Sequence, residues 1–524
     1  MSQRRVRSSF LVFLMLSSVL IALVGPASPV LANNETTSGT ITTSETWSGN
    51  HQLTGDVTIA SGAKLIIEPG TTVIFPNGTY LDVRGNLCAG DRTCGASGDA
   101  SLANKITFRW TDPANDSEIG ECKGMKQGSQ EIQVEDASCF EGVLIRSSID
   151  LSETGFRHIT IDDAWGIPYY IDSINRWRYG AMVIDGASPT LTQMSFSNIN
   201  TSSVLTTNLA QPIFVDGTYI AGNDQKSGVG GSAVQIYGSG TQVTPLVMNS
   251  PLFVGTDNGC GNNDGGRPTL WAQETFIEIN DATVNTGDYG FAFVSSSGSL
   301  TNSDINVNCN GVDINGVKAI QGVAYTFEVG NNEIETDEGS GITVYDGGDA
   351  ELHNNAISGV ADRSGITIQS SKAHIHNNDI GPIGGWNGLW LTGSFDVIAE
   401  YNAISDTAKT PIQVGELASS GPAPSASRLH FTNNTVSVNN PGTCSSFKYW
   451  GGEYTCPAVS VFRSGVTLYD NDFSLGGDSD GIRAIGGLMD VQRNSFNVAG
   501  TGAVVRNYDS GFANTQQYLS LIHI

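Results

Sequence analysis

Histidine side chains recur at a fixed spacing in the C-terminal half of the chain. The stretch HNNAI begins at His353 and returns as HNNDI at His376, 23 residues later, with His374 two positions before the second motif. Side chains two apart on a strand point to the same side, so His374 and His376 should share a face. Imidazoles about 5 Å apart on neighbouring strands are candidate ligands for Zn²⁺ or Cu²⁺. We therefore consider a metal site formed by His353, His374 and His376; a solvated face that tolerates histidine is the favoured alternative, because an open sheet imposes no tetrahedral geometry.

A second group of candidate residues lies between Asp162 and Gly180, where aromatic and arginine side chains are interleaved. These are Trp165, Tyr169, Tyr170, Arg176, Trp177, Arg178 and Tyr179. Aromatic faces stack on sugar rings, and arginine pairs with uronate or sulfate groups. The segment therefore predicts either a carbohydrate-binding loop or a loop whose rings pack it onto the body of the protein. Packing is favoured, because a long loop needs a small core of its own.

The same segment begins with the acidic pair Asp162 and Asp163. Two suitably separated carboxyl groups can act as acid and base in glycoside hydrolysis. Adjacent aspartates are also common in turns, where their side chains bond to nearby backbone groups. The pair is therefore a weak catalytic candidate.

The elements that must position these residues form a repeat. Asparagine followed two positions later by an apolar residue recurs at spacings of 23, 23, 24, 32, 37 and 23, at Asn332, Asn355, Asn378, Asn402, Asn434, Asn471 and Asn494. A period of this length, with alternating apolar residues inside each repeat, predicts a solenoid of short strands. Asn355, Asn378 and Asn402 should tolerate left-handed turns and form a ladder of stacked amides. Aligned on this asparagine, His353, His376 and Glu400 fall in one column, and Glu351 and His374 in the next.

Further segments support the same architecture. SGITVYD begins at Ser340 and SGITIQS at Ser364, and the N-terminal segment GDVTIASGAKLIIEPGTTVIF begins at Gly55. The chain thereby resembles the right-handed parallel β-helix, the pectin-lyase-like superfold. The resemblance implies an all-β solenoid with coils of about 23 residues and insertions in side loops. It also implies polysaccharide lyases, hydrolases and epimerases, and copper-associated periplasmic proteins, among proteins of this fold. The N-T-D, G-H-G and R-I-K motifs of polygalacturonase-type hydrolases are missing.

The chain divides into four predicted segments. Residues 1–32 have an arginine-containing start, a short apolar run and small residues before the end, which predicts a cleaved signal peptide. Residues 33–50 are expected to be a linker or cap, residues 51–510 the β-helix, and residues 511–524 a truncated C-terminal end. No other apolar run is long enough to predict a membrane span.

Cysteine and charge content fit an exported protein. Eight cysteines predict disulfides, paired by proximity as Cys88–Cys94, Cys122–Cys139, Cys260–Cys309 and Cys444–Cys456. The net charge of −26 disfavours binding to nucleic acid or anionic lipid. It also disfavours acidic polysaccharides, unless Ca²⁺ or a local basic patch intervenes.

These features predict a secreted or cell-surface protein that is structural, adhesive or carbohydrate-binding, with a polysaccharide or surface glycan as partner. A polysaccharide lyase or glycoside hydrolase is one alternative, and a metal-binding exported β-helix is another. No cofactor is required by the sequence; calcium or a transition metal is the candidate. Whether the protein is catalytic, and its oligomeric state, stay open.

Overall fold

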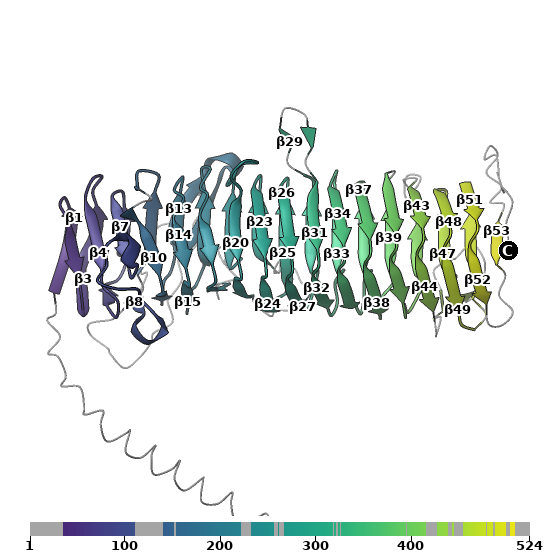
Figure 1. Cartoon of the computed structure of the whole chain (residues 1–524), viewed down its shortest axis with the longest axis horizontal. Coiled ribbons are helices and arrows are strands. Elements are labelled where there is room, and N and C mark those ends of the chain that lie inside the picture. Colours follow the sequence, from purple (N-terminus) through teal and green to yellow (C-terminus); the bar gives the residue numbers. More distant parts are fainter. Residues whose placement is uncertain are drawn as a thin grey trace, which may run out of the picture.

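The computed structural model shows an elongated stack of short strands with successive coils side by side along its long axis (Figure 1). It describes residues 35–508 apart from 111–139, 151–152, 222–231, 256–259, 261–266, 318, 321–322, 325, 395, 416–426, 439–442, 445–453, 478, 486–487 and 499–503. The described elements are strands and short 3-10 helices, η1 (Arg92–Cys94), η2 (Leu102–Asn104) and η4 (Asp172–Ile174). Among the described residues, no helix is long and apolar enough to cross a membrane.

Each complete coil contributes one strand to each of three parallel ladders, termed face 1, face 2 and face 3. Face 1 contains β6 (Tyr80–Val83), β9 (Gly142–Arg146), β13 (Arg176–Asp185), β16 (Ser202–Thr207), β19 (Val234–Tyr237), β22 (Pro268–Gln273), β25 (Tyr289–Val294), β28 (Val312–Asn315), β33 (Ile342–Tyr345), β36 (Ile366–Gln369), β39 (Leu389–Thr392), β42 (Ile412–Val414), β47 (Val459–Phe462), β50 (Ile482–Ile485) and β53 (Val505–Tyr508).

Face 2 contains β5 (Thr72–Phe75), β8 (Ile106–Trp110), β11 (Ile159–Asp162), β15 (Ser195–Ser197), β18 (Thr218–Ile220), β21 (Leu252–Val254), β24 (Thr283–Thr286), β27 (Asp304–Val307), β32 (Glu333–Thr336), β35 (Ala356–Gly359), β38 (Asp379–Ile383), β41 (Ala403–Ser405), β44 (Thr435–Val438), β49 (Asp472–Leu475) and β52 (Ser495–Val498). Faces 1 and 2 belong to one 33-stranded sheet, because β3 (Asn50–Ile59) pairs with both β5 and β6.

Face 3 is a separate sheet of 16 strands. It contains β2 (Glu45–Trp47), β4 (Lys64–Ile67), β7 (Asn86–Ala89), β10 (Gly155–Arg157), β14 (Thr190–Thr192), β17 (Ile213–Val215), β20 (Leu246–Asn249), β23 (Phe276–Asn280), β26 (Ser297–Thr301), β31 (Phe327–Gly330), β34 (Asp349–His353), β37 (Lys372–His376), β40 (Val397–Glu400), β43 (Arg428–Thr432), β48 (Gly465–Tyr469) and β51 (Leu488–Gln492).

Three short additions lie beside the ladders. β12 (Ile167–Ile171) pairs antiparallel with β13, β29 (Ala319–Ile320) with β30 (Val323–Ala324), and β45 (Thr443–Cys444) with β46 (Tyr454–Thr455). At the N-terminus, β1 (Glu35–Ile41) pairs parallel with β3, and β2 pairs with β4. Most of the segment expected to be a linker or cap is therefore made of strands stacked on the solenoid.

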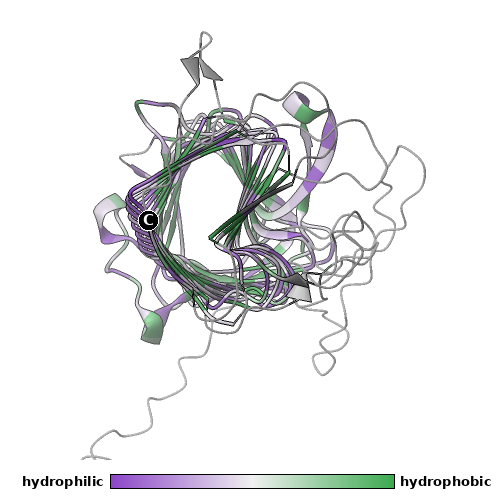
Figure 2. Cartoon of the chain, turned by 90° about the vertical axis from the view of Figure 1, so that its right-hand side faces the viewer, coloured by the Kyte–Doolittle hydropathy of each residue, from purple (hydrophilic) through white to green (hydrophobic). Residues whose placement is uncertain are grey.

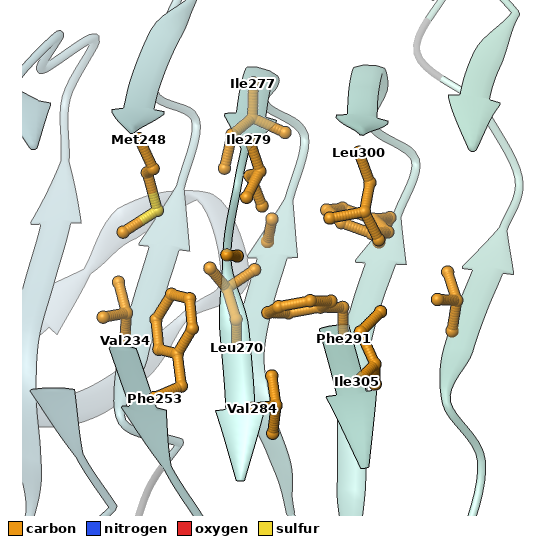
Figure 3. Packing of buried hydrophobic residues seen from close by; sticks show 14 of the residues in the cluster. Val234, Met248, Phe253, Leu270, Ile277, Ile279, Val284, Phe291, Leu300 and Ile305 are labelled. Carbon is orange, nitrogen blue, oxygen red and sulfur yellow. The ribbon is translucent and has the colours of Figure 1, made fainter. Parts of the chain in front are cut away.

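Alternation along each strand fills the interior with apolar side chains. Viewed along the long axis, the ladders enclose a common centre (Figure 2). Phe253, Phe291 and Leu270 come from successive coils and point toward one another inside it (Figure 3), and all three are buried. A buried leucine or phenylalanine contributes roughly 1.5–3 kcal/mol relative to an exposed one, so each coil is stable only against its neighbours.

The repeated asparagines form a buried ladder at the turn from face 3 into face 2. Nδ2 of Asn355 donates to Oδ1 of Asn378 at 2.9 Å, and Nδ2 of Asn378 donates to Oδ1 of Asn402 at 2.9 Å. The predicted amide ladder is therefore confirmed. The left-handed conformation was assigned to the wrong asparagine, because the preceding residues carry it, with φ of 53° at Asn354 and 56° at Asn377. The ladder asparagine thus points inward while its predecessor makes the turn.

Two of the predicted disulfides are present. Cys88 bonds to Cys94, and Cys260 bonds to Cys309, linking residues 49 apart in sequence. Cys456 is also disulfide-bonded, to a cysteine whose side chain lies outside the described residues. Cys122 and Cys139 lie outside the described residues too, as does the predicted signal peptide.

Candidate functional site

Several long insertions share one turn, the connection from face 2 into face 1, which we term the variable turn. It is extended between β8 and β9, β11 and β13, β18 and β19, β21 and β22, and β44 and β47. Elsewhere it is short, as between β15 and β16, where only residues 198–201 connect the strands. Surface loops supported by a rigid scaffold often carry function, so the side chains at this turn are candidates for a functional site.

The predicted aromatic segment forms an antiparallel hairpin at the variable turn, made of β12 and the start of β13. Tyr170 and Trp177 are cross-strand partners, with ring centroids 5.4 Å apart. Their exposed fractions are 38% and 48%, so both rings are open to solvent. The hydroxyl of Tyr170 donates to the side-chain carbonyl of Asn175, which lies at the tip with a left-handed φ of 52°. This side of the hairpin can offer ring faces to a ligand.

The other side of the hairpin packs against face 1. Nε of Arg178 donates to the hydroxyl of Tyr237 at 2.8 Å. Tyr169 packs with the buried cluster of Leu144, Ile167, Ile171, Val183, Leu205 and Tyr237. Burial, followed by a hydrogen bond to Asp185, raises the pKa of Tyr169, so its phenol stays neutral. One side of the hairpin therefore packs onto the body of the protein, and the other side is exposed to solvent.

Two of the aromatic side chains predicted to stack on sugar rings are buried. Trp165 is 2% exposed and Tyr179 is 3% exposed, so neither presents a ring face to a ligand. Trp165 follows the acidic pair, and its backbone carbonyl accepts from Thr201 Oγ1 at 2.7 Å. Trp165 and Tyr179 are therefore excluded as carbohydrate-binding residues, and the remaining candidates lie on the exposed side and edge of the hairpin.

Three arginines gather beside that hairpin. Arg176 is exposed, Arg178 is partly buried, and Arg267 enters from the end of another insertion at the same turn. Burial and the charges of Arg178 and Arg176 lower the pKa of Arg267, which shows that the three guanidinium groups lie near one another. Like charges repel, so this cluster is a favourable place for an anionic group. Arg267 was not predicted, because its position next to Arg178 depends on the stacking of separate coils.

A second group of cations and rings lies farther along the variable turn. The guanidinium carbon of Arg363 is 5.3 Å from the ring centroid of Trp386, and Nζ of Lys409 is 5.1 Å from it. Trp386 is 38% exposed, and its ring meets that of Trp390 on β39 at 6.2 Å in an edge arrangement. This group was not predicted from the sequence. Its signal was the spacing, because Arg363, Trp386 and Lys409 are each 23 residues apart, like the histidine motifs.

Face 1 also carries an unusual acid between these two groups. Burial raises the pKa of Asp313 to about 6, although hydrogen bonds from Asn310 and Thr343 oppose that shift. Nδ2 of Asn310 donates to Oδ1 of Asp313 at 2.9 Å. The pKa of Tyr289 is raised by burial and by the nearby Asp313, and lowered by Arg363. A carboxyl group whose pKa is raised toward neutral pH, and which lies near a phenol, has the composition of an acid–base site.

The predicted acidic pair has the contacts of a structural turn. Oδ1 of Asp162 accepts from Ser197 Oγ at 2.5 Å and from Asn198 Nδ2 at 3.0 Å, and both donors lie in the next coil. Asp163 has a left-handed φ of 58°, and burial together with the charge of Asp162 raises its pKa to about 6. These bonds tie neighbouring coils together; the catalytic role of the pair stays a prediction.

The histidines lie on face 3, away from the rings described above. His353 and His376 are register partners on β34 and β37, and Glu351 and His374 are partners on the same strands. On β40, Glu400 is the register partner of His376. The column of Glu351 and His374 continues through Ile398 to His430 on β43. The columns predicted from the asparagine alignment are therefore confirmed.

Each of these histidines bonds diagonally to a glutamate in an adjacent coil. Nε2 donates to the carboxylate in three pairs: His353–Glu328 at 2.9 Å, His376–Glu351 at 3.3 Å and His374–Glu400 at 3.0 Å. The imidazoles stack, with centroids 5.2 Å apart for His353 and His376, and 4.5 Å apart for His374 and His376. Imidazole nitrogens and carboxylate oxygens thus lie close together on one partly exposed patch of face 3.

One family model matches part of the chain, and several solved structures are similar to it. No curated protein matches the sequence. Similar solved structures include a mutant of the periplasmic alginate epimerase AlgG (13% identity, 70% of this chain and 76% of that chain, TM-score 0.33). They also include the Dettilon tailspike protein (10%, 84% and 62%, 0.31) and the Streptococcus pneumoniae surface protein and adhesin PfbA (11%, 90% and 91%, 0.27). Residues 315–515 match the family model described as a right handed beta helix region. With its parallel ladders and three-strand coils, this chain has the fold of a right-handed parallel β-helix.

Proposed function

We propose that the protein is an exported β-helix that binds an acidic polysaccharide along face 1 and the variable turn. The observation that carries this proposal is the pairing of exposed rings with cations at two places on that turn. Tyr170 and Trp177 lie on the exposed side of the hairpin whose other side carries Arg176 and Arg178, and Trp386 lies between Arg363 and Lys409. Ring faces bind the apolar faces of sugars, and the cations bind uronate or sulfate groups.

The charge distribution supports an anionic ligand. The chain as a whole carries a net charge of −26, which repels acidic polymers. Against this background, Arg363 and Lys409 contact the ring of Trp386, and Arg176, Arg178 and Arg267 lie near one another at the hairpin that carries Tyr170 and Trp177. These local cations support the binding of an acidic ligand at the variable turn.

The span between the two ring groups suits a polymer better than a single sugar. β13 and β39 are separated on face 1 by β16, β19, β22, β25, β28, β33 and β36. Eight steps at the usual strand spacing of about 4.8 Å correspond to roughly 38 Å. On the four intervening strands nearest β39, one outward column carries small or short side chains, namely Ala292, Asp313, Thr343 and Thr367. On β22, β19 and β16 the same column continues as Trp271, Gln235 and Leu205. An extended chain can therefore lie over β25 to β36 without meeting a large side chain in this column.

Binding measurements with ring variants test this proposal. We expect the protein to bind alginate, pectate or chondroitin sulfate in calorimetric titrations, and not dextran, which is neutral. Removing one stacked ring should cost about 1–2 kcal/mol, so Trp177→Ala and Trp386→Ala should each weaken binding roughly 5–30-fold. Circular dichroism should show unchanged folding, because both side chains are exposed.

A matched control is available at another turn. Tyr401 is 58% exposed and lies between β40 and β41, with a left-handed φ of 57° that asparagine tolerates. Tyr401→Asn therefore removes an exposed ring without strain and should leave binding unchanged. Equal affinity of wild type, Trp177→Ala and Trp386→Ala for the acidic polymers, or equally tight binding of dextran, would overturn the proposal.

A second candidate function is lyase or hydrolase activity centred on Asp313. The specific observation is that burial raises the pKa of Asp313 to about 6. The nearby Tyr289 has a pKa that Asp313 raises and Arg363 lowers. Acid–base catalysis is most effective when the pKa lies near the working pH. Formation of unsaturated uronate or of new reducing ends, lost in Asp313→Asn while binding persists, would support this activity. Intact polymer after prolonged incubation with wild type would eliminate it.

A further inference from the structure

We propose that Glu351, His374 and His376 form a site for a divalent transition-metal cation, of the class of Zn²⁺ or Cu²⁺. One ligand atom from each side chain can be chosen so that all three atoms lie within 4.8 Å of one another. The site lies on face 3, whereas the proposed polysaccharide surface lies on face 1 and the variable turn. The two proposals are therefore independent, and either can fail alone.

The backbone brings the three ligands together through simple strand geometry. His374 and His376 are two apart on β37, so their side chains leave the same side of the strand. Glu351 lies on β34 directly opposite His374, in the adjacent coil. Because both strands are held in long ladders with buried inner faces, the starting points of the three side chains are fixed before any metal binds.

The observed separations fit a bound cation. Nε2 of His376 and Oε1 of Glu351 are 3.3 Å apart. Two ligands on a tetrahedral cation with bonds of about 2.0–2.1 Å are roughly 3.3–3.4 Å apart. These two atoms already have the spacing of two corners of a zinc tetrahedron. The imidazole of His374 lies beside that of His376, with centroids 4.5 Å apart and planes inclined by 38°, and a side-chain rotation brings it to the third corner.

Neighbouring groups are placed to orient both imidazoles. The amide of Asn377 lies 3.0 Å from Nδ1 of His376, so after an amide flip its carbonyl can accept the Nδ1 proton when Nε2 binds a metal. Oε1 of Glu400 accepts from Nε2 of His374 at 3.0 Å, which leaves Nδ1 of His374 for the cation. Metal-bound histidines usually donate their second N–H to an amide carbonyl or a carboxylate in this way.

The third histidine of the predicted set is committed elsewhere. His353 donates from Nε2 to Glu328 at 2.9 Å, and Nδ2 of Asn354 donates to its Nδ1 at 3.0 Å. Glu351 lies on the same strand as His353, in the neighbouring column, and its register partner in the next coil is His374. The structure therefore replaces His353 by Glu351 among the ligands, while His353 stacks on His376.

The donor set selects the class of cation. Two imidazoles and one carboxylate suit zinc and copper, whereas calcium and magnesium prefer oxygen ligands alone. Three protein ligands leave a fourth position for water, as in open zinc sites. The side chain of Glu351 is 48% exposed and that of His376 is 21% exposed, so the cation can enter directly from solvent.

Calorimetric titration of the chelator-treated protein tests this site. Zn²⁺ and, separately, Cu²⁺ are titrated in a buffer with excess Ca²⁺, which occupies non-specific carboxylates. We expect one equivalent to bind per chain and His376→Ala and Glu351→Gln to weaken binding by more than about 10-fold. Asn377→Gly should weaken it roughly 10-fold, as losses of orienting groups usually do.

Two control histidines distinguish the proposed ligands from a general effect of surface imidazoles. His430→Ala, in the same column on β43, and His353→Ala should each leave the dissociation constant within about threefold of wild type, well below the 10–100-fold cost of an orienting group. Circular dichroism of every variant checks that the exposed substitutions leave the fold intact. The proposal is overturned if wild type and His376→Ala give equal heats, if no stoichiometric binding occurs, or if His353→Ala matches the loss seen for His376→Ala.

Discussion

Replacing a ladder asparagine should test how far this fold depends on amide stacking. In Asn378→Ala, the Asn355 backbone N–H loses its acceptor, Oδ1 of Asn378, which lies 3.0 Å away. The side chain of Asn355 loses its bond to the same atom, and the Nδ2 group of Asn378 no longer reaches Asn402 or the carbonyl of Leu352. All of these contacts are buried, so water does not replace them freely.

The cost can be worked out from these contacts. Three lost side-chain hydrogen bonds are worth about 1 kcal/mol each, and one buried N–H without an acceptor costs about 1–3 kcal/mol. Relaxation around the small alanine recovers part of this. We expect the free energy of opening the coils next to Asn378 to fall by about 3–5 kcal/mol. Coils far along the solenoid should keep their stability, because each repeat contacts only its neighbours.

Hydrogen exchange measures this local effect. Amides of β37 and β38 should exchange faster by the factor corresponding to the lost opening energy, roughly 10²–10⁴-fold at 1.4 kcal/mol per decade, while amides of β4 and β5 stay unchanged. Asn377→Gly is the matched control, because Asn377 is exposed, has a φ of 56° that glycine tolerates, and lies outside the ladder. A change below about 1 kcal/mol for Asn378→Ala, or one equal to the control, would refute the assigned role of the ladder, since ordinary surface substitutions stay within about 0.5 kcal/mol.

Three further predictions follow from individual contacts. Burial raises the pKa of Asp313 from 3.8 to about 6, so ionisation of this carboxyl group should lower the free energy of unfolding by at most about 3 kcal/mol as pH rises from about 4 to 6. Asp313→Asn should therefore have a higher urea midpoint than wild type at pH 8 and the same midpoint at pH 4. Equal midpoints at pH 8 would contradict this. A Cβ at Gly365 would lie 2.6 Å from Ile380 Cγ2 and 2.9 Å from the Gly388 carbonyl, so Gly365→Ala should cost about 1–3 kcal/mol in urea unfolding, whereas Gly98→Ala, with nothing within 4 Å, should be neutral. Affinity for acidic polysaccharide should fall with added salt, because the cations at Arg178 and Lys409 are screened; salt-independent binding would argue against ion pairing.

Sequence reasoning was most successful where the information is local or periodic. Asparagine spacing predicted the coils, and alternation predicted which residues share a face, including the column of His353, His376 and Glu400. Both features depend on a repeat length and a strand period that every coil shares. The disulfide between Cys260 and Cys309 was predicted from the proximity of the two cysteines in the sequence.

The residues that were not predicted have partners in neighbouring coils. Asp313 has no distinctive motif, and its raised pKa results from burial between neighbouring strands. Arg363, Trp386 and Lys409 are spaced at the repeat length of 23 residues, but only the stacking of coils at the variable turn places the two cations at the ring of Trp386. Trp165 and Tyr170 look equivalent in the sequence, although one is buried and the other is exposed.

The sequence by itself therefore determined a β-solenoid, its coil boundaries and its outward columns, because turn chemistry and side-chain alternation act over a few residues and then repeat. Tertiary structure alone decided which rings are exposed, which insertions share a turn, and that His376 pairs diagonally with Glu351. The physical reason is the stacking of coils: insertions of unequal length change the sequence separation between neighbours, while the strand spacing that sets their contacts stays the same.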